Sequence, residues 1–100
     1  MRKVTKELNI VGEGKEDIIE SINKCTKFFK KEAKKGKYDR FFVYVAYSKG
    51  LDIETNVTNY KSFCKGDTGF EEFVNDVLSI IEAEKEITYS YVSVSANKES

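Results

Sequence analysis

Residues 40–58 read RFFVYVAYSKGLDIETNVT, which is two β-strand patterns separated by a short turn. Residues 41–47 are apolar at every position, as is typical of a strand that is apolar on both faces. From Leu51 onward, apolar and polar residues alternate, and this predicts a half-buried strand. Because only Ser48-Lys49-Gly50 lies between them, the two strands can pair only as an antiparallel hairpin.

A helix pattern flanks this hairpin on each side. Between residues 15 and 35, apolar residues recur at spacings of three and four, and Gly36 then suits the end of a helix. The members of this stripe are Ile18, Ile22, Cys25, Phe29 and Ala33. A second stripe spans residues 70–81. It follows Thr68-Gly69-Phe70-Glu71, which matches a capping box whose hydroxyl and carboxylate satisfy free helix amides.

Two further strand patterns lie at the beginning and end of the chain. Residues 4–11 place Val4, Leu8 and Ile10 on one face, with Lys6 as a charged exception, and residues 87–96 are rich in tyrosine and β-branched residues. The order β-α-β-β-α-β predicts a single α+β domain over residues 1–100. Its simplest form is a ferredoxin-like sandwich, with two helices on one face of a four-stranded antiparallel sheet. In that fold the strands lie in the order fourth, first, third, second, so residues 40–48 would form an edge strand.

The composition excludes several kinds of site. The chain has no histidine, so serine–histidine and cysteine–histidine nucleophile pairs are excluded and the commonest metal ligand is absent. We therefore expect no metal, no cofactor and no catalytic residue. The two cysteines do not form a CxxC motif, and no apolar run reaches the roughly 18 residues that a membrane helix needs. We expect a cytoplasmic protein that makes no membrane contact and whose cysteines do not pair with each other.

Charge is distributed unevenly, although the net charge is zero. Residues 1–40 carry a net charge of +5 and residues 41–100 a net charge of −5. Opposite its apolar stripe, the first helix pattern presents a lysine face that could follow nucleic-acid phosphates. This lysine face consists of Lys24, Lys27, Lys31 and Lys34. The second helix pattern is acidic and would lie beside the first, so we expect the two electric fields to cancel in part.

An enzyme is the third kind of function to weigh. Cys64 lies between Lys61 and Lys65, shortly before the second helix, and this environment favours the thiolate. No base or orienting residue accompanies it, and no pair of carboxylates is marked out as an acid and a base. A small enzyme that uses Cys64 or carboxylates therefore ranks below both binding functions.

The most informative feature is the placement of aromatic residues on the predicted sheet. If Phe41, Val43, Val45 and Tyr47 face the helices, and Val92 and Val94 do so on the last strand, alternation turns five aromatic residues and one carboxylate to the other face. The second and last strands are apolar enough on both faces for the opposite choice, which the sequence leaves open. The five aromatic residues and the carboxylate are Phe42, Tyr44, Tyr60, Tyr89, Tyr91 and Glu54. Such a face suits base stacking or protein contact. In the predicted strand order the two central strands are acidic and not aromatic, unlike RNA-binding sheets, so protein contact is favoured.

We therefore expect a non-catalytic protein-binding module that acts through the sheet face and its edge. A nucleic-acid-binding module, using the aromatic sheet residues or the lysine face, is the alternative. The apolar edge strand further predicts a homodimer, or failing that a tight heteromeric contact, through the sheet face around Phe42 and Tyr44, because an uncovered apolar edge and face invite contact with another chain. In size and composition the chain is analogous to small phage-encoded inhibitors of host defence proteins, although no motif supports this analogy.

Overall fold

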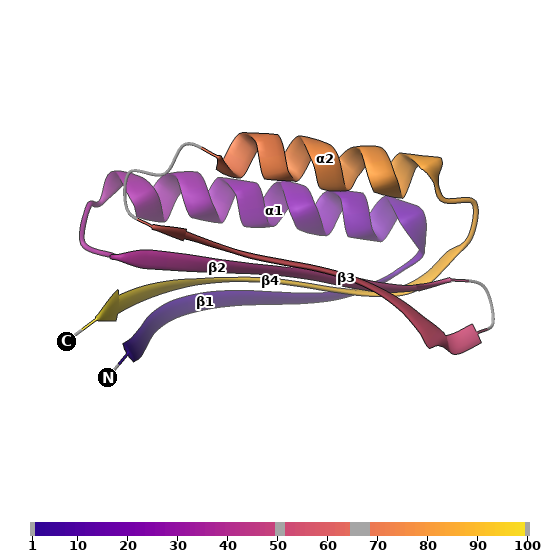
Figure 1. Ribbon diagram of the computed structural model, residues 1–100, viewed down its shortest axis with the longest axis horizontal. Helices are drawn as coiled ribbons and strands as arrows, with labels where there is room; N and C mark the ends of the chain where they lie inside the picture. The colour runs from indigo at the N-terminus through magenta and orange to yellow at the C-terminus, as the bar shows by residue number, and fades with distance from the viewer. Residues whose placement is uncertain (1, 50–51, 65–68, 100) are drawn as a thin grey trace.

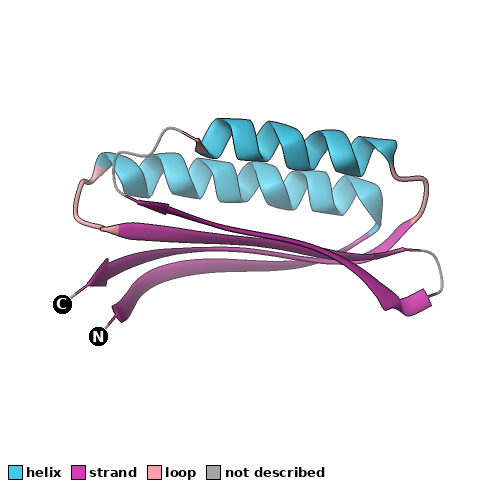
Figure 2. Cartoon of the chain, viewed as in Figure 1, coloured by secondary structure: helices cyan, strands magenta, loops and turns pink. Residues whose placement is uncertain are grey.

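The computed structural model describes residues 2–49, 52–64 and 69–99, with side chains described at residues 6–49, 63 and 69–98 (Figure 1). The elements are β1 (Arg2–Glu13), α1 (Gly14–Lys34), β2 (Arg40–Lys49), β3 (Asp52–Cys64), α2 (Phe70–Ala83) and β4 (Ile87–Glu99). The two helices lie side by side, run in opposite directions and cover the same face of the sheet (Figures 1 and 2). The predicted α+β class, with two helices on an antiparallel sheet, is confirmed.

Hydrogen bonds join the strands in the order β1-β4-β2-β3, and every neighbouring pair is antiparallel. The predicted strand order is therefore wrong, because β2 and β4 are central while β1 and β3 form the edges. The sequences give a reason for this arrangement. β2 is apolar on both faces and β4 carries no charge before Lys98, whereas β1 contains Lys6 and Glu7. Strands without charges suit central places, and charged residues are common on edge strands.

The β2–β3 hairpin is antiparallel, as predicted. The prediction that β2 forms an edge is wrong, since its backbone pairs on both sides. Tyr44, for example, lies opposite Tyr60 of β3 and opposite Ser93 of β4. The backbone groups of β2 are therefore used within the sheet, and the expected hazard of an apolar edge at Phe42 and Tyr44 does not arise.

The core lies between the sheet and the two helices. Alternate residues of β2 are buried against the helices, and those between them are half-buried on the opposite face, which decides between the two orientations that the sequence left open. The buried strand residues are Phe41, Val43, Val45 and Tyr47 of β2 and Val92, Val94 and Ala96 of β4. At one end of the core, the ring of Phe29 on α1 stacks on that of Phe70 on α2, with centroids 3.8 Å apart. Phe63 of β3 packs edge-on against both rings and so ties the hairpin to the helix layer.

The buried stripe of α1 differs from the prediction at one place. Ala33 is exposed, and Glu32 is completely buried instead. Glu32 follows Phe29 by three residues and Cys25 by seven, so it lies on the same helical face as these core residues. A sequence pattern of apolar residues alone could not show that a carboxylate continues the stripe.

Two lysines neutralise the buried Glu32 carboxylate. Nζ of Lys6 on β1 lies 3.1 Å from Oε2, and Nζ of Lys35 lies 3.0 Å from Oε1. Burial alone would raise the pKa of Glu32, but the contacts with Lys35 and Lys6 outweigh it and lower this pKa below its ordinary value. The charged exception in the first strand pattern therefore has a partner on the helix that covers the sheet.

The ends of the two helices are joined at one point. Nζ of Lys15, in the first turn of α1, donates hydrogen bonds to the backbone oxygens of Glu82 at 2.8 Å and Glu84 at 3.2 Å. These oxygens belong to the C-terminal end of α2, where carbonyls lack helical partners. At its other end, α2 begins after Gly69, and the predicted capping residue Thr68 lies outside the described residues. In the described part of the chain, neither helix is both long and apolar enough to cross a membrane.

Candidate binding face

The sheet face turned away from the helices carries no layer of described chain, and we call it the open face (Figure 2). Four aromatic residues lie on it, two from each central strand: Phe42, Tyr44, Tyr89 and Tyr91. Tyr89 and Tyr91 are 55% and 38% exposed, and Phe42 and Tyr44 are half-buried. The predicted aromatic residues of β2 and β4 thus come together on one surface. They lie on the two central strands, which sequence reasoning had expected to be free of aromatic residues.

The ring of Tyr91 is held by its neighbours. Its centroid lies 5.9 Å from that of Tyr44. Its hydroxyl donates to Oδ1 of Asn9 on β1 at 2.9 Å, and Nδ2 of Asn9 donates to Oε1 of Glu7 at 3.1 Å. A ring fixed in this way loses little conformational freedom when a partner binds, so Tyr91 is a preorganised contact.

A shallow hollow of about 150 Å³ lies at one end of the open face. Its lining residues are Ala46, Tyr47, Ser48, Tyr89, Ser90 and Tyr91. Ala46 lies opposite Tyr91 in the β2–β4 register, and its small side chain leaves space beside the ring. Sites for small molecules and cofactors usually measure about 300–1,000 Å³, so this hollow is large enough only for a side chain or a similar group.

The surface between the aromatic residues of the open face is polar and weakly charged. Ser93 and Ser95 are half-buried there on β4. The charged side chains described on the open face are Glu7 and Glu13 on the β1 edge and Arg40 at the start of β2. The surface therefore combines flat apolar rings with hydrogen-bonding groups and carries little net charge.

Two predicted members of this surface, Tyr60 and Glu54, belong to β3. The register sets Tyr60 opposite Tyr44. The side chains of Tyr60 and Glu54 lie outside those described. Their place on the open face therefore stays a prediction.

The predicted lysine face lies in the helix layer, away from the open face (Figure 1). Its four members, Lys24, Lys27, Lys31 and Lys34, are all exposed on α1. Nζ of Lys24 lies 3.2 Å from Oε1 of Glu20 on the same helix, and Nζ of Lys30 lies 3.3 Å from Oε1 of Glu71 on α2. Carboxylates thus meet lysines on and between the helices. The lysine face and the open face do not form one site.

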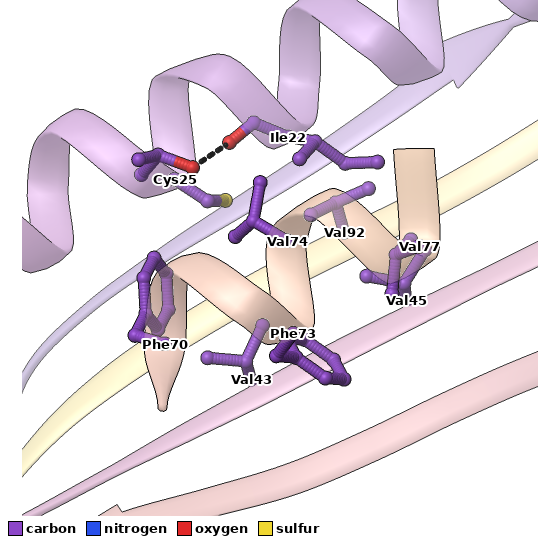
Figure 3. Close-up of a pocket in the computed structure, with 10 residues that line it drawn as sticks. Ile22, Cys25, Val43, Val45, Phe70, Phe73, Val74, Val77 and Val92 are labelled. Atoms are coloured by element: carbon purple, nitrogen blue, oxygen red, sulfur yellow. Dashed lines mark hydrogen bonds between the residues drawn. The ribbon is translucent and has the colours of Figure 1, made fainter. Parts of the chain in front are cut away.

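Cys25 is part of the core, and burial raises the pKa of its thiol to about 12. The thiol is therefore protonated at neutral pH and is not a nucleophile there. It lines a void of about 10 Å³ between the helices and the sheet, which is no larger than one water molecule needs (Figure 3). The side chain of Cys64 lies outside those described. Within the described residues, no three acidic or cysteine side chains gather closely enough to hold a metal ion.

Sequence reasoning missed one contributor to the open face, Val11 on β1, and the contact that Asn9 of the same strand makes with Tyr91. Asn9 anchors the hydroxyl of Tyr91. Val11 lies opposite Tyr91 in the β1–β4 register, and its side chain is 76% exposed. A signal was present in the sequence. Val11 lies on the same face of β1 as Glu7 and Asn9, whose polar side chains indicate that this face is turned to solvent. An exposed apolar residue on that face adds contact area for a partner.

No family model, curated protein or solved structure matches the chain. The chemistry of the open face is therefore the basis for a functional proposal.

Proposed function

We propose that the chain is a non-catalytic protein-binding module whose contact surface is the open face. The observation that carries this proposal is the group of four aromatic side chains on the central strands, set among serine, alanine and asparagine: Phe42, Tyr44, Tyr89 and Tyr91. Tyrosine and phenylalanine are enriched at protein interfaces. Tyrosine offers a large, rigid contact area, and serine and asparagine add adaptable hydrogen bonds, as they do in antibody paratopes.

The proposed partner is a different protein. The homodimer predicted from the sequence relied in part on an uncovered β2 edge, and β2 is central. A second copy would have to bind through the open face itself. A two-fold contact of that kind would bring Glu7 and Glu13 of both copies to one interface with only Arg40 of each copy to offset them. We therefore favour a partner that complements these carboxylates.

Single-stranded nucleic acid is the second candidate, and one observation favours it. RNA-binding sheets carry their stacking residues on the two central strands, and the aromatic residues of this chain lie on those strands. The charges favour protein, because phosphate contacts supply much of the affinity for nucleic acid. Arg40 is the only cation among the described side chains of the open face. Salt-sensitive binding of a labelled oligonucleotide that Tyr44→Glu abolishes would reverse this ranking.

We propose that the sandwich is a variant of the ferredoxin-like arrangement, since its element order agrees with that fold while its strand order differs. We propose the cytoplasm as the compartment, on the ground that the two cysteines suggest no disulfide framework. A role as a phage-type inhibitor of a host defence protein rests on size and composition alone.

Capture of partners from a lysate of the source cells, followed by mass spectrometry, tests the proposal. Two variants place a carboxylate on the open face, Tyr44→Glu on β2 and Tyr89→Glu on β4. We expect both to lose a partner that the wild type retains, because burying an unpaired charge in an interface is costly. Since Tyr89 is more exposed than Tyr44, its replacement disturbs the sheet less.

The matched control is Ile80→Glu, which adds the same charge at an exposed apolar residue of α2, in the helix layer. This variant should retain the partner. Circular dichroism should show that all three variants are folded. A partner that binds all three folded variants equally well would refute the open face as the contact surface.

A further inference from the structure

We propose that the hollow between Tyr89 and Tyr91 receives an arginine side chain of the partner protein. This inference rests on the proposed function, because it names the chemistry that the open face recognises. The hollow has a volume of about 150 Å³, and Ala46 is one of its lining residues. Three features of its walls favour a flat cation over a neutral group.

The first feature is the spacing of the two walls. Tyr89 and Tyr91 are two residues apart on β4, so both project from the open face. Alternate residues of a strand lie about 6.6–6.8 Å apart, which is close to twice the stacking distance of about 3.5 Å between carbon atoms. The backbone spacing therefore leaves room for a planar group between the two side chains. Among the ring contacts of the described residues, none joins Tyr89 to Tyr91, so the space between them is not closed by their own contact.

The second feature is the tilt of Tyr91. Its ring contacts Tyr44 and its hydroxyl bonds to Asn9, and both of these residues lie opposite Ser93 in the register. Tyr91 therefore leans along the strand away from Tyr89. This lean opens the hollow above Ala46 and holds one wall in position before a partner arrives.

The third feature is a carboxylate beside the hollow. Glu13 lies directly opposite Tyr89 in the β1–β4 register, and its side chain is exposed on the same face. Its backbone amide donates to Oδ2 of Asp17 at 3.0 Å, which fixes the position of the residue. The carboxylate makes no cap hydrogen bond to α1 and no ion pair with another described residue. It is therefore free to pair with a cation held between the tyrosines.

Arginine fits these features better than the other cationic side chain. The guanidinium group is flat, stacks on aromatic faces and presents several donors in a fixed plane, whereas the lysine ammonium is compact and strongly hydrated. One arginine can stack between Tyr89 and Tyr91 while it donates to Glu13.

An NMR titration with two matched tripeptides tests the inference. Acetyl-glycyl-arginyl-glycinamide is added to ¹⁵N-labelled protein, and the same peptide with citrulline in place of arginine serves as the control. Citrulline has nearly the same shape and no charge. We expect the arginine peptide to shift the amides of Ala46, Ser48, Tyr89 and Tyr91, and the citrulline peptide to bind roughly 3- to 10-fold more weakly. Glu13→Gln should reduce this preference, and Tyr89→Leu should weaken binding of the arginine peptide.

Several results would overturn the inference. Equal affinity for the two peptides would show that charge is not recognised, and shifts confined to the helices would place the peptide elsewhere. If the arginine peptide does not bind while Tyr44→Glu and Tyr89→Glu still abolish capture of the partner, the arginine site is refuted and the protein-binding face stands. If the peptide binds as expected but every folded variant captures the partner, the arginine site stands and the proposed function is refuted.

Discussion

Nζ of Lys6 on the edge strand β1 lies 3.1 Å from Oε2 of Glu32, a carboxylate on α1 that is completely buried. The lysine side chain remains 43% exposed, so it reaches from solvent into the core. The strand also bulges between Val4 and Lys6. An inward-pointing charge and a bulge are two devices that prevent an edge strand from pairing with other chains. We infer that Lys6 both neutralises Glu32 and protects the β1 edge.

Removal of the lysine charge should destabilise the fold. Lys6→Met keeps most of the side-chain volume but leaves the buried Glu32 carboxylate with Lys35 as its remaining partner. We expect a loss of about 1–3 kcal/mol in the free energy of unfolding, measured by urea denaturation. The control is Lys24→Met, which removes an exposed pair with Glu20 and should cost no more than about 0.5 kcal/mol. Equal effects of the two substitutions would contradict the importance assigned to the buried pair.

The same lysine should limit self-association. Lys6→Val would extend the apolar pattern of β1 at an open sheet edge, and strands of this kind pair with one another. We expect the mean mass in light scattering to rise with concentration more steeply than for the wild type. Lys6→Arg keeps the charge and should behave as the wild type does. If Lys6→Val shows the same concentration dependence as Lys6→Arg, the protective role of the charge is wrong.

Stability at acidic pH should depend on Glu32. Because its contacts with Lys35 and Lys6 lower its pKa below the ordinary value of 4.5, the unfolded chain binds the proton more readily than the folded chain. The carboxylate therefore contributes stability above its ordinary pKa, and this contribution is lost as the pH falls through the lowered value. Urea melts between about pH 5 and pH 2 should show a smaller loss for Glu32→Gln than for the wild type.

An exposed carboxylate provides the comparison for this experiment. Glu20→Gln should leave the loss of stability on acidification close to that of the wild type, because Glu20 lies on the surface of α1. A Glu32→Gln chain that loses stability on acidification as steeply as the wild type would show that Glu32 does not carry the dependence.

The Cys25 thiol should react only when the chain unfolds. In a Cys64→Ser variant it is the one remaining cysteine of the sequence. Burial raises its pKa to about 12, so even mildly alkaline buffer leaves it protonated and covered. We expect no reaction with Ellman's reagent in the native protein and one equivalent after denaturation. Rapid labelling of the folded variant would place the thiol outside the core.

Much of the local structure could be predicted from the sequence, because it follows from short-range periodicity. The period of two along β2 predicted that alternate residues share a face, and the spacing of three and four predicted the stripe from Ile18 to Phe29. Because β2 is apolar on both faces, its sequence left open which set of residues meets the helices. The turn after Ser48 required a hairpin. The same period grouped Phe42 with Tyr44 and Tyr89 with Tyr91, and the structure showed that both pairs lie on the open face.

Only the tertiary structure decided which strands lie side by side. The observed strand order is β1-β4-β2-β3. The arrangement predicted from the sequence has the same β2–β3 hairpin and also has two helices on one face of the sheet. Local patterns cannot separate the two arrangements, since strand order depends on pairing between segments far apart in the chain, such as β2 with β4, which the predicted order does not contain. This choice made Phe42, Tyr44, Tyr89 and Tyr91 neighbours on the central strands. It also brought Lys6 beneath α1, where Glu32 is buried. The contact between Lys6 and Glu32 joins residues 26 positions apart, and local periodicity cannot predict such a contact.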